Sequence, residues 1–215
     1  MNKAAMLEKH QERFAKYLER FQAIPDLPFI TATVMASDYA GMQSVEELYR
    51  SGEVDFHTAQ GLVGSYARLE WVHLHLSVGE VEESVVFEML PELWAFSDPD
   101  DTRPEFLSLW KRAKEWNGGI LYGKTTKPLM VDKIRLYRGQ MPGEFGFAWS
   151  LDMDVAQRFA RGAGVRCPQP GTLYTGEANT KDVLGHMTER GEAEIIIDPE
   201  HVYNRVSIGT YLRKE

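Results

Sequence analysis

The spacing of apolar residues changes from helical to strand-like near residue 131, and no other feature constrains the fold as much. In residues 3–22 the apolar side chains recur at helical spacing. A later helix is expected between Pro104, which suits a first helical turn, and Gly118, which suits a helix end. From "KIRLYRGQ" onward, apolar and polar residues alternate as on a strand with one buried face. We therefore expect an α+β protein.

The same change divides the chain into a helical portion, residues 1–125, packed on a strand-rich portion, residues 126–215. The sequence leaves open whether the helical portion folds alone. Further helices are expected over residues 43–51, 57–76 and 80–90, and the acidic stretch 97–101 is interpreted as a turn and helix cap. The strand-rich portion is expected to contain a helix over 152–162 and strands over 133–140, 145–150, 171–178, 193–198 and 202–212.

Charge and hydropathy limit the classes of partner. The net charge is −8 and the pI is near 5.3, so the chain lacks the basic character of a nucleic-acid-binding protein. No stretch approaches the run of about 18 apolar residues that a membrane span needs, and the first residues lack the apolar core of a signal peptide. We expect a cytoplasmic protein that binds proteins or small molecules. His73 and His75 lie two apart on an expected helix without a ligand at metal-binding spacing, so no metal site is predicted.

The stretch "ERGEAEIIID" places two glutamates, Glu192 and Glu194, at the start of an aliphatic run that is typical of a buried strand. Residues two apart on a strand point to the same face, so the two carboxylates are expected side by side. For an isolated Glu-x-Glu, a solvated start of a strand is the more common explanation. Paired carboxylates nevertheless perturb each other's pKa, and this happens at functional sites more often than elsewhere.

The order of three segments makes a functional interpretation stronger. Arg138 ends a Tyr-Arg-Gly on an expected strand, and Ser150 follows about ten residues later, just before a helix with the pattern Asp-x-x-x-Ala-x-x-Phe-Ala. Glu192 and Glu194 come two further elements downstream. Taken singly, Arg138 is explained as a surface charge on an edge strand, and Ser150 as the cap of the helix that begins near Asp152.

In this order, residues 131–208 resemble the Arg-Ser-Glu class of mono-ADP-ribosyltransferases. The segments "YRG", "AWSLDMDVAQRFA" and "ERGEAEIIIDPEHV" are similar to those of short uncharacterised proteins carried by phages and prophages. The resemblance implies two packed antiparallel sheets with a cleft for NAD between them. It does not extend to the helical portion.

The resemblance also implies roles for individual residues. Arg138 would bind the phosphate side of NAD, and Gly139, which lacks a side chain, would let nicotinamide approach the backbone. Ser150 would support the catalytic glutamate, Glu194. Glu192 would orient the guanidinium of an acceptor arginine.

Three further expectations come from the same resemblance. Residues 185–191 correspond to the loop that recognises the target protein. Trp149 and Phe159 are candidates, together with Phe147, for stacking on nicotinamide, although an aromatic residue beside a strand is more often part of the core. Ala148 takes the first position of the family's Ser-Thr-Ser segment, where the family has a serine.

The chemistry is consistent with these residue types. Nicotinamide is already a cationic leaving group, so a carboxylate that stabilises an oxocarbenium-like ribose meets the main need of the reaction. The planar fork of an arginine suits a pyrophosphate. A second carboxylate holds and activates an arginine acceptor.

We therefore expect an enzyme that transfers ADP-ribose from NAD⁺, as substrate, to a side chain of an unidentified target protein, with arginine as the first guess. If the chain is phage-encoded, the target lies in the host cytoplasm. Hydrolysis of NAD⁺ is one alternative, and a catalytically inactive, partner-binding protein of the same fold is another, which Ala148 favours. Two close carboxylates also suit a glycosidase, but Arg138 and the order of motifs favour the transferase.

Overall fold

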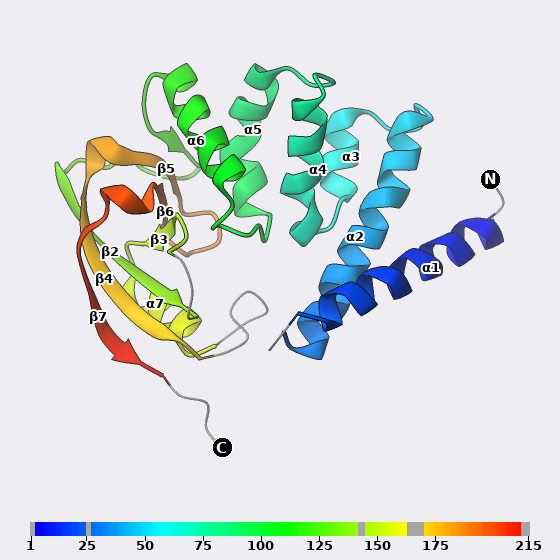
Figure 1. The fold of residues 1–215 in the computed structure, drawn as a ribbon. Coiled ribbons are helices and arrows are strands. Elements are labelled where there is room, and N and C mark those ends of the chain that lie inside the picture. The colour runs from blue at the N-terminus through cyan, green and yellow to red at the C-terminus, as the bar shows by residue number, and fades with distance from the viewer. Residues whose placement is uncertain (1–2, 25–26, 142–144, 163–169, 212–215) are drawn as a thin grey trace. The chain divides into compact units, whose positions relative to one another are not determined.

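The computed structural model of the chain describes residues 3–24, 27–141, 145–162 and 170–211 (Figure 1). The chain forms two compact units: a helical unit of residues 1–82 and 96–99, and a sheet unit of residues 83–95 and 100–215. Two helices upstream of residue 125 therefore belong to the sheet unit, which differs from the division expected at residues 125 and 126. No described helix has the length and apolar character needed to cross a membrane.

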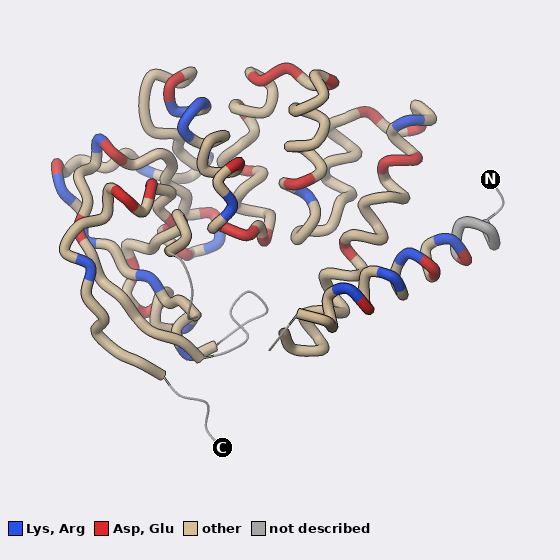
Figure 2. Tube along the Cα trace, in the orientation of Figure 1, with Lys and Arg blue, Asp and Glu red and all other residues tan. Residues whose placement is uncertain are grey.

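Four helices make up the described residues of the helical unit. They are α1 (Lys3–Gln22), α2 (Phe29–Arg50), α3 (Phe56–Leu62) and α4 (Ser65–Ser77). The helix expected over 3–22 is confirmed, and charged residues of both signs follow one another along it (Figure 2). Phe21 of α1 packs with Ala32 and Ala36 of α2 in a small buried cluster. The N-terminal half of α2 was not predicted, because several of its buried positions are alanines, which give a weak apolar signal.

The single helix expected over 57–76 is two helices, α3 and α4. The break falls at Gly64, which precedes the first residue of α4. A Cβ on Gly64 would lie 2.2 Å from an Asp38 carboxylate oxygen, so a larger residue here would have to displace the Asp38 side chain.

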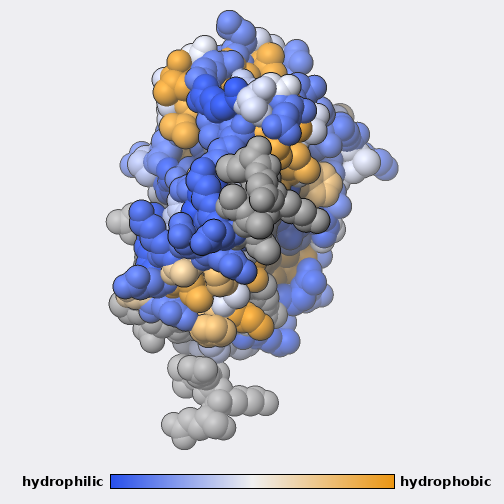
Figure 3. All heavy atoms as spheres, turned by 90° about the vertical axis from the view of Figure 1, so that its right-hand side faces the viewer, coloured by the Kyte–Doolittle hydropathy of each residue, from blue (hydrophilic) through white to orange (hydrophobic). Residues whose placement is uncertain are grey.

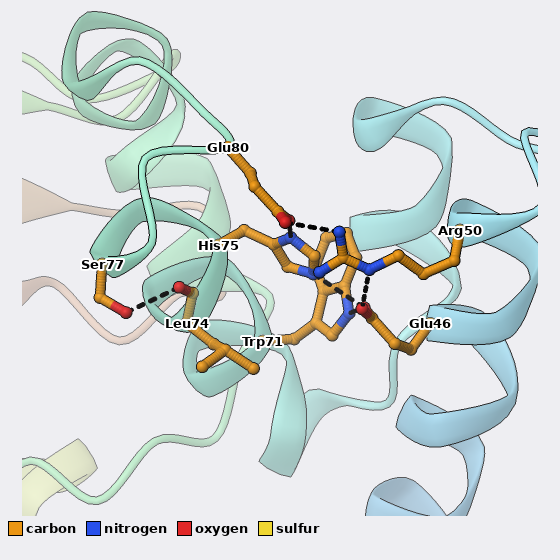
Figure 4. A network of polar contacts seen from close by, with 7 residues as sticks. All are labelled: Glu46, Arg50, Trp71, Leu74, His75, Ser77 and Glu80. Carbon is orange, nitrogen blue, oxygen red and sulfur yellow. Dashed lines mark hydrogen bonds and ion pairs between the residues drawn. The ribbon is translucent and has the colours of Figure 1, made fainter.

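A buried histidine network joins α4 to α2 (Figure 4). The His75 side chain is fully buried; its Nδ1 lies 2.6 Å from a Glu80 oxygen, and its Nε2 lies 2.8 Å from a Glu46 oxygen. Arg50 bridges the same two glutamates, and Trp71 Nε1 donates to Glu46 at 2.8 Å. Both ring nitrogens of His75 thus face carboxylate oxygens, and the network ties α4 and the residues after it to α2.

The sheet unit contains three helices, seven strands and two short 3₁₀ turns in its described residues. They are α5 (Glu83–Ala95), α6 (Pro104–Asn117), β1 (Leu121–Tyr122), β2 (Lys133–Gln140), β3 (Ala148–Ser150), α7 (Met153–Ala160), β4 (Thr172–Asn179), η1 (Thr180–Asp182), β5 (Val183–Met187), β6 (Glu194–Ile197), η2 (Pro199–His201) and β7 (Tyr203–Thr210). The strand over 133–140 is confirmed to the residue. The expected helix over 80–90 instead continues through the buried Pro91, and β5 was not predicted as a strand.

The strands form one seven-stranded mixed sheet in the order β1-β5-β6-β3-β2-β4-β7. The strands that were expected as two packed antiparallel sheets are therefore linked into one mixed sheet. Only β1 and β5 pair in parallel, whereas the other neighbours are antiparallel. The sheet is continuous because β3 pairs with β6 on one side and with β2 on the other, although Tyr137 and Ser150 are the only residue pair that joins β2 to β3.

One face of this sheet carries the main apolar core of the unit. Ile134 and Leu136 of β2 lie in it with Trp149 of β3 and with Ile195 and Ile197 of β6. These residues alternate with residues that point to the opposite face, as the pleat of a strand requires. The position of each residue in its strand therefore decides whether its side chain enters this core.

Helices cover the opposite face. Tyr137, on β2, packs against the cluster formed by Ala156 and Ala160 of α7 with Leu173 of β4. At the next position on that face, a Cβ on Gly139 would lie 2.1 Å from the Ala156 carbonyl oxygen and 2.3 Å from the Ala160 nitrogen. The close packing of α7 on β2 therefore requires glycine at this position.

Acid should destabilise the network around His75. Burial raises the pKa of Glu46, but hydrogen bonds from Arg50, His75 and Trp71 outweigh burial and lower it overall. Carboxyl groups with lowered pKa stabilise the fold above the pKa of the unfolded chain, and this contribution is lost as pH falls through the lowered value. We expect the melting temperature, followed by circular dichroism, to fall less steeply between pH 7 and about 3 in Glu46→Gln than in wild type. The exposed Glu82→Gln is the control, and equal slopes in all three chains would contradict the prediction.

A methyl group at position 139 should destabilise the sheet unit. Gly139→Ala forces α7 away from β2, and overpacking of this kind costs about 1–3 kcal/mol. The control is Gly119→Ala, because a Cβ there meets nothing within 4 Å. Urea denaturation measures both free energies of unfolding. If Gly139→Ala has the same free energy of unfolding as Gly119→Ala, α7 can move away from β2 without loss of stability, which would contradict the prediction.

Candidate functional site

The three motif segments lie on adjacent strands. Arg138 is on β2, Ser150 is on β3 and Glu194 begins β6, in that order across the sheet. Ser150 pairs with Tyr137 on one side and with Glu194 on the other. Segments that are far apart in the chain thus meet in one row of the sheet.

Ser150 connects this row to the Glu-x-Glu segment. Its Oγ donates to the Glu192 carbonyl oxygen at 2.6 Å and accepts from the Asp152 N–H at 3.0 Å. The Ser150 side chain is therefore not the helix cap. Asp152 is the N-cap of α7, and its carboxylate accepts from the N–H groups of Asp154 and Val155. Ser150 instead holds the backbone that leads into Glu194.

The two glutamates do not share a strand face. β6 begins at Glu194, and the intervening Ala193 has a φ of +44°. The rule that residues two apart lie on one face applies only within an extended strand, so strand alternation does not place these two carboxylates side by side. A left-handed conformation costs a non-glycine residue about 1–2 kcal/mol. Strain of this kind is retained where surrounding contacts enforce it, and it concentrates at functional sites.

Side-chain contacts anchor the loop that precedes Glu194. The Glu189 carboxylate accepts from the N–H groups of Thr125 and Thr188, at 3.2 and 2.9 Å. Arg190 donates to the Ala95 carbonyl oxygen at the end of α5. The loop spans residues 188–193, because Gly185–Met187 of the expected recognition loop belong to β5.

Arg138 leaves the sheet on the face opposite to Glu194. Arg138 follows the core residues Ile134 and Leu136 at alternate positions, whereas Glu194 alternates with the core residues Ile195 and Ile197. By strand alternation Arg138 and Glu194 thus lie on opposite faces of the sheet, whereas the NAD cleft that the resemblance implies would need them on one face. Arg138 Nη1 instead binds the Ala148 carbonyl of β3, beyond the single residue pair that joins the two strands.

Asp101 is a partner of Arg138 that the sequence did not reveal. Its two carboxylate oxygens accept from Nη1 and Nη2 of Arg138, at 2.6 and 3.2 Å. The stretch 97–101 was interpreted as a turn and helix cap, and Asp100 does accept hydrogen bonds from Thr102. No local pattern distinguishes Asp101 from Asp100, because its partner lies 37 residues away.

The remaining predicted binding residues have packing contacts. Trp149 is 2% exposed, lies in the core of the sheet unit and stacks on Phe145, and this burial counts against contact with nicotinamide. Phe147 is also 2% exposed and packs on Trp94. Phe159 is half-buried on α7. Gly139 contacts α7 on the side where its Cβ would project.

Two surface hollows in the sheet unit lie away from these residues. One, of about 470 Å³, is lined by residues 129–132 and 179–181, and the other, of about 450 Å³, lies between α6, η1 and η2. In the described part of the chain, no three His, Cys, Asp or Glu side chains are grouped to hold a metal ion. The face in Figure 3 shows hydrophobic patches among hydrophilic residues.

Comparison with family models, curated proteins and solved structures finds no match to this chain.

Strain at Ala193 should be measurable. Ala193→Gly removes the left-handed penalty, so the free energy of unfolding should rise by about 1 kcal/mol. Ala156→Gly is the control with the opposite sign, because glycine inside a helix costs about 1 kcal/mol. Urea denaturation of both variants checks the prediction. A loss of stability in Ala193→Gly would show that the alanine side chain matters more than the backbone strain.

Proposed function

We propose that the chain cleaves NAD⁺ and transfers its ADP-ribose to a protein side chain. The observation that carries the proposal is the row in which Ser150 pairs with Glu194 while its Oγ holds the Glu192 carbonyl. The strand with Arg138 is the next neighbour of β3. This arrangement supports the order of roles that the resemblance to mono-ADP-ribosyltransferases implies.

In the proposed reaction, Glu194 stabilises the positive charge that develops on ribose. The bond between ribose C1′ and nicotinamide nitrogen breaks, and its electron pair leaves with neutral nicotinamide. A preorganised carboxylate lowers the barrier because the charge appears only in the transition state. Ser150 contributes by fixing the backbone on the N-terminal side of Glu194.

Glu192 is proposed to receive the acceptor. A nitrogen of an arginine side chain forms the new bond to C1′ and loses one proton, for which the Glu192 carboxylate is the nearby base in this scheme. The left-handed Ala193 turns the backbone between Glu192 and Glu194, and in this proposal the ribose and the acceptor meet different side chains. The anchored loop at residues 188–193 suits a surface that must hold an acceptor in place.

The place proposed for the pyrophosphate is beside Arg138, where β2 and β3 cease to pair. The strands share one residue pair, and beyond it the Arg138 guanidinium reaches the Ala148 carbonyl of β3. A dinucleotide that lies across the two strands here would contact Arg138 and Glu194 from the two faces of the sheet. A guanidinium is well suited to phosphate because it can donate two parallel hydrogen bonds to the phosphate oxygens.

A partner-binding protein without catalytic activity is the second candidate. Two observations favour it: Asp101 occupies the Arg138 guanidinium, and Trp149 is buried in the core. The alanine at position 148 agrees with this alternative. The measurement below separates the two candidates.

Nicotinamide release from NAD⁺ should depend on Glu194. We expect Glu194→Gln to slow release about a hundredfold or more, the loss typical of a removed transition-state contact. The exposed Glu200→Gln on η2 is the matched control and should release nicotinamide at the wild-type rate. Glu192→Ala should lose transfer to an arginine-containing peptide while still cleaving NAD⁺. Failure of the wild type to bind or cleave millimolar NAD⁺ would favour the partner-binding candidate.

A further inference from the structure

Arg138 and Asp101 form a bidentate ion pair inside the sheet unit. The two carboxylate oxygens face Nη1 and Nη2, and the side chains are only 12% and 21% exposed. Such fork-to-fork pairs are stronger and more directional than a single contact between charges. At this degree of burial, the charge of one partner is largely satisfied by the other.

The described contacts engage four of the five N–H groups of Arg138. Nε donates to Gln140 Oε1 at 2.6 Å, Nη1 donates to Asp101 and to the Ala148 carbonyl, and Nη2 donates to Asp101. A guanidinium has five donors in a fixed plane. At most one donor therefore remains for another acceptor, so a phosphate group cannot bind bidentately while Arg138 keeps its contacts with Asp101.

Asp101 is itself held firmly. Its Oδ2 also accepts from the Ala148 N–H at 3.0 Å, and its carbonyl oxygen accepts from the Phe147 N–H at 3.0 Å. A Cβ on Gly146 would lie 2.3 Å from its Oδ2, so the backbone closes around the carboxylate. The carboxylate is thus fixed at β3, and the long arginine side chain is the partner with more freedom to change contacts.

We propose that Asp101 is a built-in competitor that occupies the Arg138 guanidinium until a pyrophosphate-bearing ligand replaces it. The ligand class rests on the proposed function, in which Arg138 binds the pyrophosphate of NAD. The competition lowers the affinity for the ligand, because part of the binding free energy is consumed in breaking the ion pair between Arg138 and Asp101. The Asp101 carboxylate and the pyrophosphate are both anionic and compete for the Arg138 guanidinium. Only one of them can engage both Nη1 and Nη2 at a time.

A purely structural ion pair predicts different behaviour. If Asp101 only stabilises the fold, its neutralisation lowers stability and leaves ligand affinity unchanged. If Asp101 only repels anions by its charge, its neutralisation strengthens anion binding whether or not Arg138 is present. Competition for the guanidinium predicts a gain in affinity that requires Arg138.

A double-mutant cycle separates these cases. We expect Asp101→Asn to bind NAD⁺ and inorganic pyrophosphate about tenfold more tightly in isothermal titration calorimetry, since a hydrogen bond to a charged group contributes about 1.5–3 kcal/mol. The gain should vanish when Arg138→Gln is also present. Asp132→Asn, an exposed position on the same unit, removes the same charge and should change affinity less than about twofold.

An unchanged or weaker affinity in Asp101→Asn overturns the inference, as does an equal gain in the Arg138→Gln background. Failure of the inference differs from failure of the proposed function. If the wild type releases nicotinamide and Asp101→Asn binds no tighter, the function stands and the inference falls. If nothing cleaves NAD⁺ but Asp101→Asn tightens pyrophosphate binding through Arg138, the inference stands and the function falls.

A measurement on the wild-type chain guards against a variant that does not fold. Saturation with pyrophosphate should shift the NMR resonance of the Arg138 side-chain Nε–H and that of the Ala148 backbone N–H, because both groups belong to the same contact set. Saturation without a shift at Arg138 would overturn the inference. Asp101→Ser, which keeps an acceptor near the Ala148 N–H but removes the charge, repeats the calorimetric test.

Discussion

The three-residue strand β3 is the constraint on which the sheet unit depends. It pairs with β6 along its full length and with β2 at one position, so it joins the two halves of the seven-stranded sheet. Its central residue, Trp149, enters the apolar core, while Ser150 holds the backbone before Glu194. Its first residue, Ala148, contacts both members of the Arg138–Asp101 pair through its backbone. The three residues of β3 thus contribute to the apolar core, to the continuity of the sheet and to the candidate site.

The alternation of side chains on neighbouring strands distributes the candidate site over two faces of the sheet. Ser150 and Glu194 lie on the face that the helices cover, and Arg138 lies on the core face at the end of its strand. In the proposed function, a dinucleotide spans the end of the sheet where β2 and β3 share one residue pair. The Arg138 guanidinium is paired with Asp101 in the structure. In the proposal that Asp101 competes for this guanidinium, ligand binding is an exchange of anions at Arg138, and its affinity depends on the internal pair as well as on the ligand.

Local patterns predicted elements well where the apolar signal is strong. The helix over 3–22 and the strand over 133–140 appear as expected, because large apolar residues mark their period. The first half of α2 was not predicted because its buried residues include Ala32, Ala36 and Ala40. Alanines pack closely but give only a weak apolar signal in the sequence. The strand rule did not apply to Glu192 and Glu194, because it assumes extended backbone and Ala193 is left-handed.

The sequence alone determined the α+β class and the types of most elements, because these depend on spacing between residues that are near neighbours. The chain order of Arg138, Ser150 and Glu194 is also read directly from the sequence. The tertiary structure decided that the strands form a single mixed sheet, that Arg138 and Glu194 leave it on opposite faces and that Trp149 is a core residue. It also decided that Asp101, 37 residues from Arg138, is the partner of the guanidinium. These features follow from strand register and from contacts between distant segments. Many chain paths satisfy the same local periodicity, and only packing of the whole unit selects one of them.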